Sequence, residues 1–348
     1  MESINAKRVF PENPVAYLKE FLEQRKPSSL FLLCDRNTRR HCLPLLKEAL
    51  PAKTSIICLP AGEASKSLAS CEIIWEEMGR KQADRNALLL CLGGGMIGDL
   101  GGFATSVYKR GIDFVLLPSS LLAMADACLG GKTGIDFGHF KNQIGSFAPA
   151  QEIILIPEFL KTLPGEELLS GMAEICKHAL CGNADAWQLL RKSEVHRQNW
   201  PNLIAGSLNF KAAITESDPQ EKGARKILNA GHTLGHALES FFLKKGNPQP
   251  HGHCVAAGLV MEGRLSVEKG ILSEAELLQV EEFIYAEYGI LPFGKGDIPS
   301  IIKNCRQDKK NQEGRINFSL YGPVGQCKVD QECSEDEIRF ALRYYLGL

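Results

Sequence analysis

Long apolar runs are missing from this chain of 348 residues. No stretch approaches the roughly 18 consecutive apolar residues that a membrane-spanning helix needs. The opening residues, MESINAKRVF, also lack the apolar segment of a secretory signal. We therefore expect a cytoplasmic protein without a membrane partner.

An excess of charge is missing too: 40 Lys and Arg residues face 41 Asp and Glu residues, for a formal net charge of −1. This balance gives no reason to expect nucleic acid as a partner, so any phosphate-binding site must be local. The 12 cysteines contain no Cys-x-x-Cys pair, and a chain of this length does not need disulfides. We expect reduced thiols.

Buried strands alternate with helices in the first half of the chain. Nearly continuous apolar runs, typical of a parallel sheet covered on both faces, lie at 29–35, 54–60, 87–95, 114–118 and 152–157. Helical patterns such as 67–81 separate them. The alternation predicts a Rossmann-like, doubly wound α/β domain at 1–163.

The pattern changes after Thr162-Leu163-Pro164, where strand-like runs almost vanish. Helical periodicity predicts helices at 184–194, 201–216, 228–243, 253–269 and 273–288. A strand-like run at 316–322 is expected to form a hairpin with 326–331. We therefore predict a second, mostly helical domain at 164–348.

The stretch GGGMIGD follows a strong strand and leads into a helix. Glycines let the backbone approach a pyrophosphate, and a helix N-terminus offers free N–H groups. The pattern is not the usual G-x-G-x-x-G, so a tight turn without a ligand is the alternative. Nearby, five polar residues are expected on glycine-rich loops that suit a phosphorylated substrate: Arg110, Asp126, Lys132, Lys141 and Asn142.

Two histidines, His232 and His236, stand four residues apart in a run that reads as a helix. Such a pair is a weak metal motif by itself and is more often packed or solvated. Its neighbours strengthen it, because PHGHC offers His251 or His253 and GMAEICKHAL offers Glu174. One carboxylate with two or three imidazoles is a zinc set with an open position.

A polar stripe precedes this pair. Arg225, Asn229, His232 and His236 follow helical spacing, which predicts one helix face lining a wet pocket. We expect this pocket, and with it the active site, in the cleft between the two domains.

Taken together, these stretches resemble the 3-dehydroquinate synthase family of sugar-phosphate cyclases. The matching segments run in family order from about residue 60 to residue 310, and they include LPAGEASKSL, GGGMIGDLGGF, YKRG, LLAMADACLGGKTGI, KNQIGSF, GMAEICKHAL, EKGARKILNAGHTLGHALE, HGHCVAAG and DKK.

The resemblance implies residue roles that spacing alone does not. The metal, Zn²⁺ or Co²⁺, would bind Glu174, His232 and His251. NAD would contact Asp35, Glu63, Lys66, Gly93, Gly94, Gly95, Asp99, Ser119, Ser120, Lys132, Lys141 and Thr162. Catalytic roles would fall to Asp126, Lys132, Lys177, Asn229 and His236. Substrate would also contact Asn142, Lys211, Arg225 and Lys309 or Lys310, with Arg110 reaching the phosphate of a neighbouring subunit in a homodimer.

The implied reaction converts 3-deoxy-arabino-heptulosonate 7-phosphate to 3-dehydroquinate and phosphate, a step of aromatic amino acid biosynthesis. NAD transiently oxidises C5, phosphate leaves by β-elimination, the hydride returns, and an aldol step closes the carbocycle. Four departures from the family pattern keep every group this chemistry needs: His253 replaces a usual Glu, Ser119-Ser120 replaces Thr-Thr, Asp136 replaces Asn, and DLGGF replaces DLAGF.

Four alternatives compete with this interpretation. A cyclase acting on sedoheptulose 7-phosphate would tend to alter the carboxylate-binding cations, whereas Lys211 and Arg225 are present. A metal- and NAD-dependent polyol dehydrogenase would lack the Asn-Ala-Gly-His-Thr block. A metal-dependent hydrolase would leave the glycine loop unexplained, and a non-enzymatic regulator would be expected to have lost some of the polar site residues.

Overall fold

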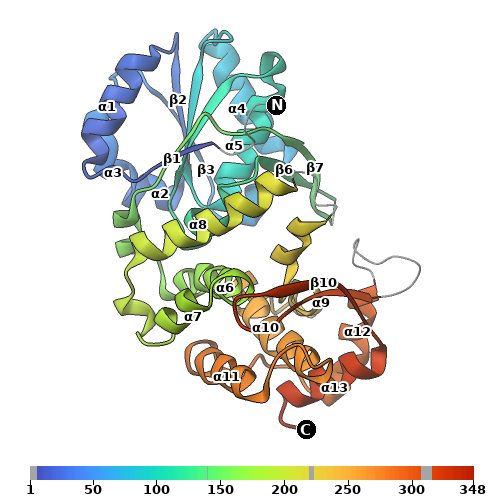
Figure 1. Ribbon diagram of the computed structural model, residues 1–348. Coiled ribbons are helices and arrows are strands. Elements are labelled where there is room, and N and C mark those ends of the chain that lie inside the picture. The colour runs from blue at the N-terminus through green and yellow to red at the C-terminus, as the bar shows by residue number, and fades with distance from the viewer. Residues whose placement is uncertain (1–5, 139, 219–222, 307–315) are drawn as a thin grey trace. The chain divides into compact units, whose positions relative to one another are not determined.

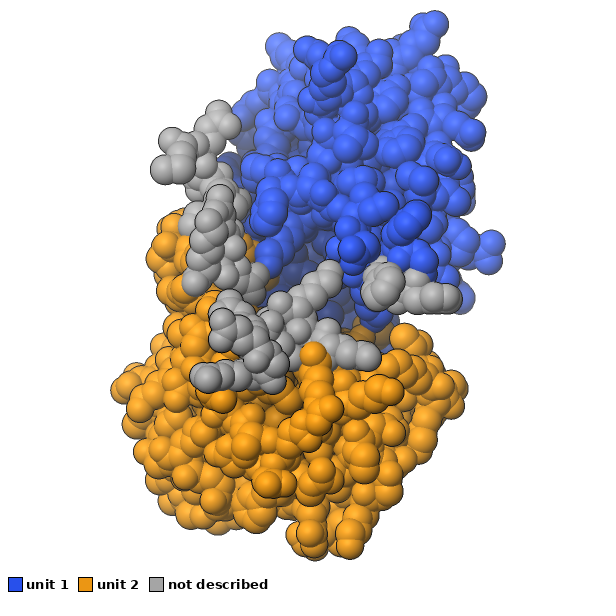
Figure 2. Space-filling view, turned by 90° about the vertical axis from the view of Figure 1, so that its right-hand side faces the viewer, with its two compact units in different colours: residues 1–164 blue, residues 165–348 orange. Residues whose placement is uncertain are grey.

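The computed structural model describes residues 6–138, 140–218, 223–306 and 316–348. The chain forms two compact units, Met1–Pro164 and Gly165–Leu348, which are coloured separately in Figure 2. The division falls one residue beyond the boundary expected from the sequence. None of the described helices combines the length and apolar character needed to cross a membrane.

Unit 1 is built on a six-stranded parallel sheet in the order β1-β8-β5-β4-β2-β3. Its strands are β1 (Lys7–Val9), β2 (Leu30–Asp35), β3 (Ser55–Leu59), β4 (Leu88–Gly93), β5 (Asp113–Pro118) and β8 (Glu152–Ile154). The five apolar runs are confirmed as strands; β1, a short edge strand, has no such run.

Helices cover both faces of this sheet, with α1 and α3 on one side and α4 and α5 on the other (Figure 1). The α-helices of unit 1 are α1 (Pro14–Arg25), α2 (Arg36–His41), α3 (Leu43–Leu46), α4 (Leu68–Arg80) and α5 (Gly95–Val107). A side chain at Gly101 would place its Cβ 2.4 Å from Cys91 Sγ. Gly101 therefore lets α5 pack closely against β4, and Gly102 lets it approach Thr133 and Phe114.

An antiparallel hairpin of β6 (Lys132–Phe137) and β7 (Phe140–Phe147) stands apart from the main sheet. The expectation of loops was wrong here, since Lys132, Lys141 and Asn142 lie in these strands. Gly134 faces Gly145 across the pair, and a Cβ at Gly145 would lie 2.4 Å from Thr133 O. The glycines that suggested loops instead permit a close approach of two strands.

Unit 2 is mostly helical. Its α-helices are α6 (Gly165–Gly182), α7 (Ala184–Leu190), α8 (Trp200–Ser217), α9 (His232–Lys244), α10 (His251–Glu268), α11 (Glu274–Tyr288), α12 (Ile298–Arg306) and α13 (Glu335–Tyr345). The expected hairpin is confirmed as β9 (Ile316–Tyr321) paired with β10 (Cys327–Cys333). Helix α10 forms the centre of the unit, with residues such as Val255, Leu259 and Val260 fully buried.

Candidate active site

Three potential metal ligands come together in unit 2, each from a different helix. Glu174 lies within α6, while His232 and His251 are the first residues of α9 and α10. Nε2 of His232 lies 3.2 Å from Glu174 Oε1, and Nε2 of His251 lies 3.3 Å from the same oxygen. Ligands bound tetrahedrally at zinc distances are separated by about 3.3 Å, so the spacing suits a single ion.

The other ring nitrogens explain why a cation fits between these groups. Nδ1 of His232 lies 3.0 Å from the carbonyl oxygen of Ala230, and Nδ1 of His251 lies 3.3 Å from Glu239 Oε2. Both Nδ1 atoms therefore carry the proton and donate it. A divalent cation suits the two remaining Nε2 lone pairs and the carboxylate better than extra protons would.

Charge and burial act against each other in this cluster. Burial alone would raise the pKa of Glu174, but the neighbouring Lys177 ammonium and His232 hold that pKa well below its usual range. Burial lowers the pKa of His232. Burial also opposes the charge on His251, yet hydrogen bonds to Glu174 and Glu239 raise its pKa to about 10. The carboxylate is therefore ionised and ready to bind a cation.

The single polar stripe expected through Arg225, Asn229, His232 and His236 was wrong. Residues Ala224–Asn229 form a 3₁₀ helix, and the chain then turns at Gly231, whose φ is +75°, before α9 begins. Glycine adopts this left-handed conformation without strain, so it allows the new helix to start in another direction. His232 is consequently the first residue of α9 rather than a point on a longer helix.

The remaining polar residues expected in unit 2 differ in burial. Lys177 and Arg225 are only 2% and 3% exposed, and Lys211 is also buried. Lys177 pairs with Glu174, one helical turn away. Asn229 is half-buried, and the exposed His236 has its ring centroid 5.1 Å from that of His232. Lys309 and Lys310 lie outside the described residues.

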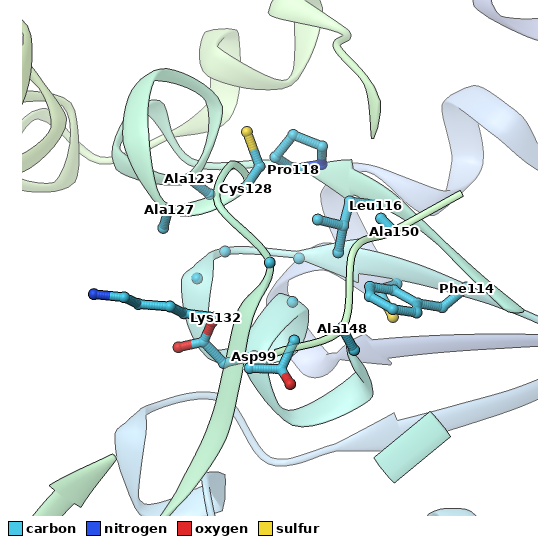
Figure 3. Close-up of a pocket in the computed structure, with 17 residues that line it drawn as sticks. Asp99, Phe114, Leu116, Pro118, Ala123, Ala127, Cys128, Lys132, Ala148 and Ala150 are labelled. Atoms are coloured by element: carbon cyan, nitrogen blue, oxygen red, sulfur yellow. The ribbon is translucent and has the colours of Figure 1, made fainter. Parts of the chain in front are cut away.

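The glycine-rich loop of unit 1 borders a pocket at the end of β4 (Figure 3). Gly94 is the N-cap residue of α5, and Gly95 is the first residue of that helix. A Cβ at Gly93 would lie 2.4 Å from Ile97 Cβ, so this position tolerates no side chain without rearrangement. Lys132 and Asp99 lie on one side of the pictured pocket, opposite Phe114 and Leu116. The pocket thus combines a glycine-lined wall with one polar side.

Hydrogen bonds join several predicted cofactor and substrate residues of unit 1. The buried Lys66 ammonium lies 2.6 Å from Asp99 Oδ2 and 2.5 Å from Asn142 Oδ1. Asp136 accepts a hydrogen bond from Asn142 N at 2.8 Å, and its own N–H donates to Lys66 O at 2.9 Å. Asn142 has φ +52°, so this network holds it in an uncommon left-handed conformation.

Other residues of unit 1 that were predicted to bind NAD or substrate lie on several separate elements. The buried Ser119 and Ser120 follow β5, and Ser119 N donates to Gly93 O. Asp126 is half-buried in a π-helical turn, Ala123–Ala127. Oδ1 of Asp35 accepts backbone hydrogen bonds that cap α2, and Glu63 lies 3.9 Å from Lys66. Several of these residues are exposed, namely Glu63, Arg110, Lys132, Lys141 and Thr162.

Sequence reasoning missed Glu239 and left the choice of His251 or His253 to the resemblance. Glu239 lies seven residues after His232 on α9, a spacing that could have drawn attention to it. His253 instead packs edge-on against Tyr288, with ring centroids 5.3 Å apart. Among the described residues its buried Nδ1 has no hydrogen-bond partner. The structure thus groups His251, not His253, with the other two candidate ligands.

Comparisons with known proteins agree along the whole chain. A 2-epi-5-epi-valiolone synthase from Streptomyces hygroscopicus, solved with NAD⁺ and Zn²⁺ bound, superposes with a TM-score of 0.87 at 22% identity, covering 100% of this chain and 98% of that one. A 2-deoxy-scyllo-inosose synthase solved with carbaglucose-6-phosphate, NAD⁺ and Co²⁺ has a TM-score of 0.84 at 19% identity, covering 97% and 96%. At these identities the likeness shows the fold.

Sequence relatives carry the assignment further. The 3-dehydroquinate synthase from Parabacteroides distasonis is 39% identical over 333 residues, which cover 94% of each chain. That from Campylobacter concisus is 36% identical, covering 83% of this chain and 84% of its own. The models of the 3-dehydroquinate synthase N-terminal and C-terminal domains match residues 56–170 and 171–311. The chain belongs to the 3-dehydroquinate synthase family.

Proposed function

We propose that this protein is a carbon–oxygen lyase that converts 3-deoxy-arabino-heptulosonate 7-phosphate to 3-dehydroquinate and phosphate, with NAD and Zn²⁺ or Co²⁺ as cofactors. The observation that carries the proposal is the set of Glu174, His232 and His251, whose three ligand atoms lie within 4.8 Å of one another. The family membership and the glycine-lined pocket of unit 1 support it.

The bound cofactors would supply transient hydride acceptance at C5 and polarisation of the oxygen on that carbon. Glu174, His232 and His251 would hold the metal, and Gly93, Gly94 and Gly95 would leave room for the dinucleotide phosphates. Because oxidation and polarisation act on the same carbon, the two units must present these sites to one substrate.

Two buried cations of unit 2 suit the carboxylate of the substrate. Arg225 would bind the carboxylate through two parallel hydrogen bonds, with Lys211 adding charge, because a guanidinium fork matches carboxylate geometry. Lys177, already paired with Glu174, would keep the metal-binding carboxylate ionised. Four further residues would bind the substrate oxygens or relay protons among them: Asp126, Lys132, Asn229 and His236. Asn142 would also bind the substrate.

A homodimer is part of the proposal. Arg110 is exposed, with φ +66°, directly after Lys109, which also has a positive φ. This turn would present the guanidinium to the phosphate bound by a second copy. Light scattering coupled to size-exclusion chromatography checks the stoichiometry, and a monomer that is fully active would refute this role of Arg110.

The decisive experiment follows phosphate release from 3-deoxy-arabino-heptulosonate 7-phosphate together with absorbance at a wavelength where NADH absorbs. Phosphate formed with catalytic NAD and no net NADH is expected. Accumulation of NADH would identify a polyol dehydrogenase instead. Phosphate released only from sedoheptulose 7-phosphate would retain the cyclase chemistry and replace the substrate.

A further inference from the structure

A fully buried carboxylate, Glu262, lies on α10, three helical turns after the candidate ligand His251. Its Oε2 accepts a hydrogen bond from Gly231 N at 2.6 Å, and its Oε1 accepts one from Leu234 N at 3.0 Å. These two N–H groups belong to the N-cap residue and the third residue of α9. In a capping box, two separate side chains within the helix satisfy these positions. Here one carboxylate from a neighbouring helix satisfies both.

Glycines make this arrangement possible. The N-cap of α9 is Gly231, which has no side chain to cap the helix. A Cβ at Gly258 on α10 would lie only 2.0 Å from Gly231 O, so the two backbones touch at this point. Glu262 follows one helical turn after Gly258 on the same face of α10. The close approach therefore delivers the carboxylate to the start of α9.

The Ala230–Gly231 peptide group, which donates a hydrogen bond to Glu262, also contacts His232. Gly231 N–H and Ala230 C=O are the two ends of one peptide bond, and that carbonyl lies 3.0 Å from His232 Nδ1. A hydrogen-bond chain thus runs from Glu262 through the peptide to the imidazole. Hydrogen bonds in such chains polarise one another, so a carboxylate on the N–H end makes the carbonyl a stronger acceptor. A stronger acceptor at Nδ1 makes Nε2 a better metal ligand.

We propose that Glu262 is a positioning residue for the metal site, which orients His232 and increases its basicity through the Ala230–Gly231 peptide. The inference rests on the proposed function only in taking His232 as a metal ligand. Carboxylates that hydrogen-bond a metal-bound imidazole directly are a known device. The chain uses one directly for His251, through Glu239, and one across a peptide for His232.

The test compares Glu262→Gln with Glu276→Gln in the full-length protein. Glu276 is a matched control because it also caps a helix, α11, and accepts a backbone N–H from another element, at Val324. Helix α11 carries none of the candidate ligands. The metal-stripped proteins are titrated with Zn²⁺ against a chromophoric chelator, and the visible spectrum of the Co²⁺ form is recorded. Thermal unfolding without metal measures the structural effect of each change.

Glu262→Gln is expected to weaken Zn²⁺ binding about 10- to 100-fold and to shift the Co²⁺ bands. Glu276→Gln should lower the melting temperature while leaving metal affinity unchanged. Equal Zn²⁺ affinity in Glu262→Gln and the unmodified protein would overturn the proposal, as would equal weakening in both variants. A wild-type protein that binds no Zn²⁺ would instead overturn the metal site itself.

A second variant keeps the proposal testable if Glu262→Gln does not fold. Gly258→Ala leaves the carboxylate in place but forces the Ala230–Gly231 region of the chain away from α10. It should also weaken Zn²⁺ binding about 10-fold. The corresponding change at Gly206, where a Cβ would meet no atom within 4 Å, is the control that should bind Zn²⁺ normally.

Discussion

The two units of this protein hold their functional groups by different means. Unit 1 uses backbone without side chains: its glycine loop leaves β4 and enters α5 through Gly93, Gly94 and Gly95. Unit 2 uses side chains, and the buried Glu174 meets two imidazoles at the first residues of α9 and α10. The proposed phosphate cradle is thus local in sequence, whereas the proposed metal site joins residues 77 positions apart.

The largest effect that separates the units is expected from His251→Ala. Losing one of three ligands should weaken metal binding more than 100-fold, beyond what loss of a supporting residue causes. Turnover should fall on the order of 1,000-fold, since metal polarisation contributes several kcal/mol to catalysis. Metal analysis together with NAD titration measures both sites, and NAD binding should persist.

His253→Ala is the matched control for this variant, because it removes an imidazole two residues away that faces Tyr288. It should keep its metal. If His253→Ala were the metal-free protein, the ligand set proposed for unit 2 would be wrong.

Arg225→Ala should come next in size and should affect substrate rather than either cofactor. Loss of a charge-assisted hydrogen bond to the carboxylate corresponds to about 1.5–3 kcal/mol, or roughly a 10- to 100-fold change in kcat/KM. Steady-state kinetics combined with metal analysis separates the two effects. The neighbouring Lys226 pairs with Asp330 at the surface, so Lys226→Ala should change little. An equal loss of kcat/KM in the two variants would show that Arg225 does not bind the substrate.

Asp99→Ala tests the proposed NAD site of unit 1. It removes the carboxylate 2.6 Å from the buried Lys66, so we expect NAD binding to weaken about 10-fold while metal content stays normal. Isothermal titration with NAD provides the measurement. Glu77→Ala, which breaks an exposed ion pair with Arg80 on α4, should leave NAD affinity unchanged. Loss of metal in Asp99→Ala would contradict the separation of the two sites.

The smallest effect is expected at Asp136. Asp136→Ala removes the acceptor for Asn142 N, which corresponds to about 1 kcal/mol and a several-fold rise in KM. Asp136→Asn should stay near the activity of the unmodified protein, because an amide oxygen accepts the same N–H. An Asp136→Asn variant as impaired as Asp136→Ala would show that the charge, and not the hydrogen bond, matters here.

Much of the architecture could be predicted from the sequence, because buried parallel strands are written as continuous apolar runs. The runs at 87–95 and 114–118 became β4 and β5, and the helical periodicity of 273–288 became α11. The hairpin β6–β7 was missed because its glycines resemble loop residues. Periodicity also ran through Gly231, where only the close packing against Gly258 reveals that the chain must turn.

The residues of the candidate site were harder to predict from the sequence than the fold. The glycine loop could be found from local pattern, but neither Glu239 nor Glu262 stands in a recognisable motif. Both act through groups that come close only when α9 and α10 pack together. Spacing could propose His232 with His236, whose rings do lie close together, but only the fold brings Glu174 and His251 to His232 as further possible ligands.

The contact between Gly258 and Gly231 restricts how this protein can change by mutation. Any side chain at position 258 would clash with the backbone of the turn that begins α9. A single substitution there is therefore unfavourable unless the turn has already moved. A lineage that lost the carboxylate at 262 would need another acceptor for the same two N–H groups. A change at position 258 or position 262 would therefore disturb the same turn at the start of α9.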